Sequence, residues 1–226
     1  MELTEELLAL LRENGAVLAA AGDMRGVENC AYPAGVAAAI PMPRDIVRSL
    51  PDAPSREYLA AYPEINAVLD AAVSAGKTFL QSRGYTAFAQ TLSHTKVGAE
   101  RRTAVPHKTV AARAGLGWIG KNCLLVNPEY GSALMLSSLL TDAPLRCAKP
   151  VETSRCGGCS HCVDACPAHA LRGTLWSAGM PRGKIADVEA CAKKRGEIML
   201  AQNLTRPMCG RCIGVCTYTQ KYLCSE

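Results

Sequence analysis

The sequence lacks any run of 18 apolar residues, although 49% of its 226 residues are hydrophobic. A membrane-spanning helix is therefore not expected, and neither is a membrane partner. The first six residues, Met-Glu-Leu-Thr-Glu-Glu, lack the positive charge of a secretory signal, so we expect a cytoplasmic protein. With 20% charged residues and a mean hydropathy of +0.05, the composition is that of a folded globular chain rather than a disordered one.

Cysteine is the residue type in excess. The chain holds 12 cysteines, and nine of them lie in the last 71 residues. Cys30, Cys123 and Cys147 precede this group. Disulfides are disfavoured in a reducing cytosol, and a chain of this length does not need them to stabilise a core. The clustering therefore indicates metal ligands or redox thiols.

The composition changes near residue 150. We expect an α+β domain over 1–150, rich in Ala, Leu and Val, and a small domain over 151–226, rich in Cys, Gly and Arg. Periodicity and turn residues predict the elements of the first domain. They are helices over 5–14, from 55 to an interruption at Pro63, over 64–83 and over 107–114; strands over 16–21, 36–40 and 85–92; and a hairpin pairing 123–126 with 133–140.

The strongest motif is Cys-Gly-Gly-Cys-Ser-His-Cys-Val-Asp-Ala-Cys-Pro at 156–167. Its spacing, C-x2-C-x2-C-x3-C-P, is that of bacterial ferredoxins, which hold [4Fe–4S] clusters. Three thiolates spaced in this way can surround one cluster, while the fourth cysteine serves a second cluster. Zinc is the competing ligand for C-x2-C pairs, but zinc gives no reason for the continuous run.

A second motif, C-x2-C-x3-C, spans Cys209 to Cys216, and Cys191 lies upstream as a further ligand. The crossed arrangement of two-cluster ferredoxins predicts two sets of four. The first set is Cys156, Cys159, Cys162 and Cys216, and the second set is Cys166, Cys191, Cys209 and Cys212. Cys224 could take the place of Cys216. Cys30, Cys123 and Cys147 are expected to be small buried residues or idle thiols.

Residues 115–122, Gly-Leu-Gly-Trp-Ile-Gly-Lys-Asn, match G-x-G-x-x-G and nearly match a P-loop. Both nucleotide-binding motifs need a strand before the glycines and a helix after them. The order predicted here is the reverse. We therefore expect neither nucleotide binding nor a flavin or nicotinamide site at this loop.

The same loop carries a family resemblance. Residues 114–122, 124–126 (Leu-Leu-Val), 130–132 (Tyr-Gly-Ser), 139–142 (Leu-Leu-Thr-Asp) and the cysteine run together resemble the core of epoxyqueuosine reductases. The resemblance implies a nitroreductase-like core followed by a ferredoxin-like domain with two [4Fe–4S] clusters, a base-off cobalamin, and kinship with reductive dehalogenases. By analogy, the candidate cobalamin contacts are Gly115, Gly117, Gly120, Lys121, Asn122, Gly131 and Ser132.

This chain departs from the family pattern in several places. The stretch just upstream of the glycine loop has no aspartate to act as the family's proton donor. Glu100 or His107 could take that role. Thr217 follows Cys216 where the family usually has proline. The chain is short and lacks the C-terminal extension that helps the family hold tRNA. Two clusters, at about −2 each, would bring the net charge from +5 to about +1, so charge gives no support for tRNA as a partner.

The resulting prediction is an iron–sulfur reductase. Electrons from an external ferredoxin or flavodoxin would pass through two clusters to a cobalamin, which reduces a small-molecule or modified-nucleoside substrate. Two alternatives remain: a ferredoxin-like electron carrier without cobalamin, or a reductive activator of a corrinoid held by another protein. The carrier leaves the 114–132 block unexplained.

Overall fold

A computed structural model describes residues 2–52, 54, 56–93 and 103–225. The chain folds into two compact units. The sheet unit comprises Met1–Ile40, Glu64–Gly117 and Met135–Val151, and the cysteine unit comprises Pro41–Pro63, Trp118–Leu134 and Glu152–Glu226. In the part of the chain that the structure covers, no helix is long and apolar enough to cross a membrane.

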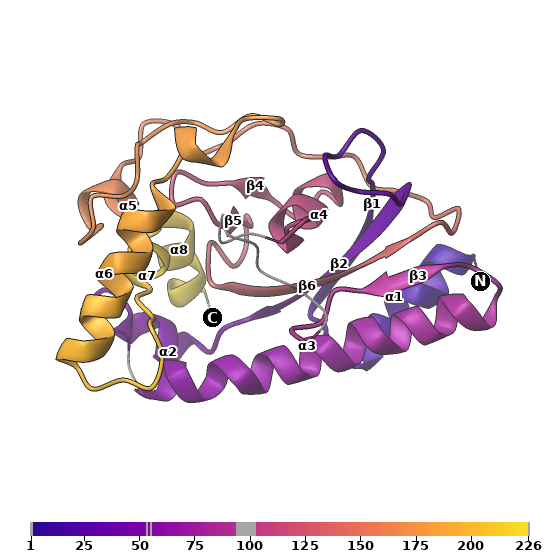
Figure 1. The fold of residues 1–226 in the computed structure, drawn as a ribbon, viewed down its shortest axis with the longest axis horizontal. Coiled ribbons are helices and arrows are strands. Elements are labelled where there is room, and N and C mark those ends of the chain that lie inside the picture. Colours follow the sequence, from indigo (N-terminus) through magenta and orange to yellow (C-terminus); the bar gives the residue numbers. More distant parts are fainter. Residues whose placement is uncertain (1, 53, 55, 94–102, 226) are drawn as a thin grey trace. The chain divides into compact units, whose positions relative to one another are not determined.

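The sheet unit is built on four strands in the order β1-β2-β6-β3 (Figure 1). These are β1 (Leu18–Asp23), β2 (Ala34–Pro41), β6 (Leu134–Thr141) and β3 (Ala87–Ala89). β1 pairs with β2, and β3 with β6, in antiparallel register. The first six residues of β2 are buried in succession, as expected of a strand covered on both faces.

Helices cover both faces of this sheet. They are α1 (Leu3–Glu13) and α3 (Arg56–Ser82) on one face and α4 (His107–Arg113) on the other (Figure 1). Gly76 of α3 lies against Leu139 of β6, whereas Gly35 of β2 lies against Leu140 and α4. Successive residues of a strand point to opposite faces, so α3 and α4 pack on opposite sides.

Two paired glycines allow α4 to approach the sheet closely. Gly22 of β1 is the register partner of Gly35 of β2. A Cβ at Gly22 would lie 2.5 Å from backbone atoms of Arg113 and Ala114, and one at Gly35 would lie 3.0 Å from Val110. Any larger residue at Gly22 would therefore displace the end of α4 from β1.

The predicted helices and strands are largely confirmed, with two corrections. α3 continues through Pro63 instead of stopping there, because its apolar face, which includes the fully buried Leu69, Val73 and Leu80, packs along its whole second half. The predicted hairpin is wrong in its pairing. Residues 127–131 do form a tight turn, but β5 (Leu125–Val126) pairs with β4 (Trp118–Ile119), and β6 joins the large sheet.

The cysteine unit consists mainly of helices and loops. Besides β4 and β5 it contains α2 (Arg44–Ser49), α5 (His161–Asp164), a 3-10 helix (Arg182–Lys184), α6 (Val188–Ala201), α7 (Arg211–Gly214) and α8 (Thr217–Cys224). Tyr222 of α8 donates a hydrogen bond to the Met42 carbonyl (3.0 Å). Gly210 and Gly214 lie against Leu50 and Pro51, so α2 supports α7 and α8.

The two cysteine motifs adopt the same local backbone. α5 and α7 are single turns that carry Cys162 and Cys212. Each ends two residues before the next cysteine of its motif, which is Cys166 for α5 and Cys216 for α7. The capping residues Ala165 and Val215 have identical dihedral angles, φ −80° and ψ −4°. The relation between the two motifs that the spacing predicted is therefore present in the backbone.

His107, at the start of α4, belongs to a polar group inside the sheet unit. Its Nδ1 lies 2.8 Å from the Ser138 hydroxyl, which also accepts a hydrogen bond from Gln90 (2.7 Å). Burial lowers the pKa of His107 to about 4. The imidazole is therefore neutral at pH 7 and is not an acid that gives up a proton there. Glu100, the other substitute for the family's proton donor, lies outside the described residues.

We expect Gly22→Ala to destabilise the protein by about 1–3 kcal/mol, because the new methyl group would overlap the backbone at the end of α4. Gly183→Ala is the control, since nothing lies within 4 Å of a Cβ there. Urea unfolding followed by circular dichroism measures both. Equal midpoints for the two variants would contradict the close approach of α4 to β1.

The second prediction concerns pH. An imidazole with a pKa of about 4 when folded and 6.5 when unfolded binds fewer protons in the folded state. The free energy of unfolding should therefore rise as the pH increases from about 4 to 6.5. His107→Asn should flatten this part of the urea-midpoint profile relative to the wild type. Parallel profiles would show that His107 is not neutral in the folded protein.

Candidate metal centres

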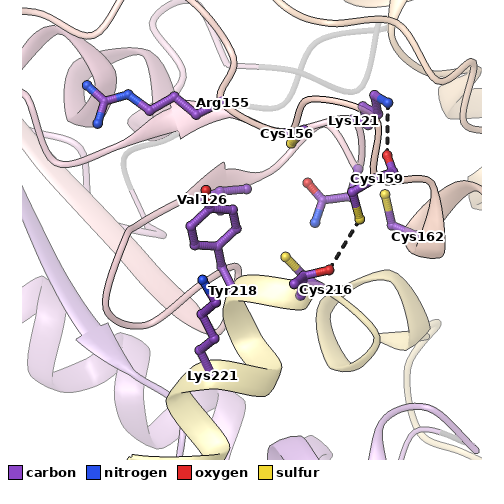
Figure 2. Close-up of a pocket in the computed structure, with 11 residues that line it drawn as sticks. Lys121, Val126, Arg155, Cys156, Cys159, Cys162, Cys216, Tyr218 and Lys221 are labelled. Atoms are coloured by element: carbon purple, nitrogen blue, oxygen red, sulfur yellow. Dashed lines mark hydrogen bonds between the residues drawn. The ribbon is translucent and has the colours of Figure 1, made fainter.

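Four predicted ligands border one cavity in the cysteine unit. Cys156, Cys159, Cys162 and Cys216 line a space of about 210 Å³ (Figure 2). The first three come from the loop around α5, and Cys216 immediately precedes α8. The structure thus brings together the first of the two sets that the crossed arrangement predicted.

The four thiols lie around a cavity that is larger than the site of a single metal ion. Within the described ranges, no three His, Cys, Asp or Glu side chains converge closely enough to hold a single metal ion. Burial, together with the neighbouring Cys216, Cys156 and Cys159, raises the pKa of the Cys162 thiol to about 12. Binding iron would replace the thiol protons, as metal binding to cysteine generally does. A cavity with thiols around its edge suits a multi-atom cluster.

Positive charge lines the same cavity. Lys121, Arg155 and Lys221 contribute to its wall, and no aspartate or glutamate does so among the residues that the structure describes. Arg155 and Lys221 are exposed, but Lys121 is only 8% exposed. A buried cation is costly unless negative charge compensates it. A cluster with four thiolates supplies such charge.

The Lys121 ammonium is bound to the loop that carries the first cysteines. It donates hydrogen bonds to the carbonyl oxygens of Gly157 (2.9 Å) and Cys159 (2.8 Å; Figure 2). Both acceptors belong to the segment from Cys156 to Cys159, which carries the first two predicted ligands of the set. Lys121 therefore fixes the backbone from which Cys156 and Cys159 project.

Two side chains make hydrogen bonds to sulfur atoms of the first set. The Trp118 indole N–H donates to Cys156 Sγ at 3.5 Å. The Thr217 hydroxyl lies 3.2 Å from Cys159 Sγ and 3.3 Å from His161 Nδ1. Trp118 is buried and packs edge-on against Tyr218, with 4.9 Å between ring centroids. Cys156 and Cys159 therefore each have a polar side chain in contact with their sulfur atom.

The second predicted set is also gathered in the cysteine unit. Burial raises the pKa of the Cys212 thiol, and the nearby Cys209 and Cys191, then Cys162 of the first set and Cys166, add to the effect. Burial likewise raises the pKa of Cys191, with Cys166 and Cys209 among its neighbours. The Ala170 amide donates to Cys166 Sγ at 3.4 Å. These four thiols therefore influence one another across three separate chain segments.

Backbone anchors hold the second set in place. Asn122 donates from Nδ2 to the Cys212 carbonyl (3.2 Å) and to the Ser132 hydroxyl (2.6 Å). Arg195, one helical turn after Cys191, donates from Nε to the Pro207 carbonyl at 2.9 Å, two residues before Cys209. Neither anchor was predicted from the sequence, because neither residue belongs to a cysteine motif.

The four remaining cysteines lie in different surroundings. Cys224 is exposed at the end of α8, whereas Cys216 lines the cavity, so the structure gives no support for exchanging them. Cys30 and Cys147 are half-buried in the sheet unit. Cys123 is buried, as predicted, but it also belongs to the electrostatic surroundings of Cys191 and has a left-handed backbone with φ 62°. Its place beside the second set was missed.

The predicted cofactor contacts are divided between the units. Gly115 and Gly117 belong to the sheet unit, and Gly120, Lys121, Asn122, Gly131 and Ser132 belong to the cysteine unit. A Cβ at Gly115 would lie 2.8 Å from the Lys149 carbonyl, one at Gly120 would meet Val126, and one at Gly131 would meet the Thr219 backbone. Ser132 accepts from Asn122 and its amide donates to Thr219 (2.9 Å). Their contacts in this structure are with the chain itself.

Comparison with known proteins agrees with this geometry. A family model of the 4Fe–4S binding domain matches residues 149–172. An epoxyqueuosine reductase from Bacillus cereus is 47% identical over 64 residues, which are 28% of this chain and 17% of that protein. The match thus covers much less than two thirds of the relative's length.

Solved structures share the fold over nearly the whole chain. A structure of epoxyqueuosine reductase with an epoxyqueuosine-modified stem loop of tyrosine tRNA has a TM-score of 0.63 at 21% identity, covering 96% of this chain and 65% of that one. A reductive dehalogenase described in connection with B12-dependent dehalogenation has a TM-score of 0.67 at 21% identity, covering 94% and 31%. The mixed α+β fold class is confirmed, and the chain is similar to epoxyqueuosine reductases, as its motifs predicted.

Proposed function

We propose that this protein is an iron–sulfur oxidoreductase that holds two [4Fe–4S] clusters and passes single electrons from an external ferredoxin or flavodoxin to an acceptor. The observation that carries the proposal is the cavity in which Cys156, Cys159, Cys162 and Cys216 meet three cationic side chains. Four thiolates suit a [4Fe–4S] cluster, and the buried Lys121 needs the negative charge that such a cluster brings.

The residues of the second set fit a second cluster. Cys166, Cys191, Cys209 and Cys212 are mutual neighbours, and their loops are anchored by Asn122 and Arg195. The clusters supply one-electron chemistry when they are bound. The chain's own part is to hold the eight thiolates, to bury the sulfurs and to set the polar groups around them.

The acceptor is a separate question. Kinship with epoxyqueuosine reductases and the fold shared with a B12-dependent dehalogenase support a corrinoid. The contacts predicted for it stay a prediction: the structure shows Gly115, Gly131, Lys121 and Asn122 in contact with other parts of this chain. Gly115 is exposed, whereas Gly131, Lys121 and Asn122 are buried, and Lys121 and Asn122 line the cavity of the first cysteine set.

The substrate class follows from the same relatives. Epoxyqueuosine reductase has been solved with a modified tRNA stem loop, so we propose a modified nucleoside as the first substrate to test. Restoration of queuosine in cells that lack their own reductase is the measurement. Restoration would favour this substrate over the other small molecules that an iron–sulfur reductase can reduce.

Ligand variants test the two-cluster proposal directly. After anaerobic reconstitution with iron and sulfide, we expect about eight irons per chain and about four in each of Cys216→Ser and Cys191→Ser. Cys224→Ser is the matched control and should keep about eight, because Cys224 is exposed and lies outside the cavity. Zinc without sulfide in the wild type would overturn the proposal, and full iron content in Cys191→Ser would overturn the second ligand set.

Reconstitution with cobalamin tests the acceptor. We expect the iron content to be the same with and without cobalamin, because all eight proposed ligands come from this chain. Retention of about one cobalt per chain after desalting would support the corrinoid reductase. About eight irons with no retained cobalt would instead support the electron carrier, and with it the alternative of reducing a corrinoid held by another protein.

A further inference from the structure

The two cysteine sets differ in the polar groups that surround their sulfur atoms. In the first set, Cys156 Sγ accepts a hydrogen bond from the buried Trp118 indole. Cys159 Sγ contacts the Thr217 hydroxyl at 3.2 Å. In the second set, the contact that the structure gives is from the Ala170 backbone amide to Cys166 Sγ, at 3.4 Å. Hydrogen bonds to ligand sulfurs stabilise the reduced, more negative state of a cluster and so raise its reduction potential.

The direction of the Thr217 hydrogen bond follows from the chemistry of the ligand. A thiolate bound to iron carries no proton, so it can only accept. The Thr217 hydroxyl must then donate to Cys159 Sγ, which leaves its oxygen free to accept from His161 Nδ1 at 3.3 Å. The side chains of Trp118 and Thr217 therefore both place positive hydrogens against the first set once it is loaded.

Charge acts in the same direction. Lys121 is a cation at 8% exposure in the wall of the first cavity, bonded to the carbonyl oxygen of a ligand residue. Around the second set, the arginines on or beside the ligand loops are Arg195, which is exposed and acts on the Cys191 thiol, and Arg211, which is half-buried and donates to the Asp52 carbonyl. Solvent screens an exposed charge much more strongly than a buried one. Lys121 is more buried than either arginine, so we expect it to stabilise an added electron more than they do.

We infer that the cluster on Cys156, Cys159, Cys162 and Cys216 has the higher reduction potential of the two. This inference rests on the proposed two-cluster function. An electron from a reduced ferredoxin or flavodoxin then moves from the second cluster, which returns to its oxidised state, to the first cluster, which becomes reduced by one electron. The first cluster is the exit of the pair, and Lys121, Trp118 and Thr217 are the residues that set this order.

Redox titration monitored by electron paramagnetic resonance tests the order. We expect two one-electron waves in the reconstituted wild type. Lys121→Met, Trp118→Phe and Thr217→Val should each lower the wave at higher potential and leave the lower wave in place. Cys216→Ser assigns the first cluster independently, because it should remove or distort the signal of the higher wave.

Matched variants separate charge and hydrogen bonding from general disturbance. Lys121→Arg keeps the charge and should leave the higher wave near its wild-type position. Lys221→Met removes an exposed cation from the wall of the same cavity and should shift that wave less than Lys121→Met. Thr217→Val, which is close to isosteric, keeps the test valid if a larger change impairs folding.

The outcomes distinguish this inference from the function on which it rests. Two clusters whose lower wave responds to Lys121→Met and Thr217→Val would overturn the proposed order and leave the two-cluster function intact. Two waves that do not respond to any of the three variants would overturn the role of these residues. A chain that binds fewer than about eight irons would instead overturn the proposed function.

Discussion

Two adjacent side chains hold both cysteine loops of this protein. Lys121 bonds to the carbonyl oxygens of Gly157 and Cys159, and Asn122 bonds to the carbonyl oxygen of Cys212. Because the two residues are consecutive in a tight turn, closed by the bond from the Cys123 amide to the Gly120 carbonyl, the positions of the two loops are linked. The rest of the cysteine unit is arranged around this link: Ser132 fixes Asn122, and Thr219 of α8 fixes Ser132.

This arrangement changes the meaning of the glycine-rich segment. The sequence Gly-Leu-Gly-Trp-Ile-Gly-Lys-Asn predicted close contact between backbone and a flat cofactor. In the structure its polar residues point to cysteine loops, and Trp118 donates to Cys156 Sγ. The segment therefore supports the cysteine loops directly, and this contact gives the glycine-rich motif a structural role that does not require a nucleotide.

Much of the site could be predicted because cysteine spacing is a local property. The run at 156–167 and the C-x2-C-x3-C motif both fold into one-turn helices with the same capping geometry, so the shared spacing goes with a shared local backbone. The crossed membership of Cys216 followed from the same ferredoxin pattern. The local helices over 5–14 and 107–114 were predictable for a similar reason, since apolar periodicity and a closing glycine lie within each segment.

The features that could not be predicted depend on distant partners. β5 pairs with β4 instead of β6, and β6 is taken into the central sheet between β2 and β3. Pro63 was predicted to interrupt the helix. The sequence does not show that Leu69, Val73 and Leu80 are buried in the folded chain, because that burial depends on the sheet against which α3 packs. Lys121 and Asn122 were assigned to cofactor contacts, and Arg195 was assigned no role, because nothing in their local sequence shows which carbonyl oxygens they reach.

The positive charge of the first cavity bears on how a cluster would bind there. The net charge of +5 is modest, but the first cavity concentrates Lys121, Arg155 and Lys221 around four thiols without an acidic neighbour among the lining residues described. With the thiols protonated, the buried Lys121 has only carbonyl dipoles to compensate it. The proposed cluster would replace those protons and bring negative charge, so its binding would stabilise the same loops that Lys121 holds. The cation that holds the cysteine loop is therefore the group through which binding of the proposed cluster and folding of the cysteine unit would be coupled.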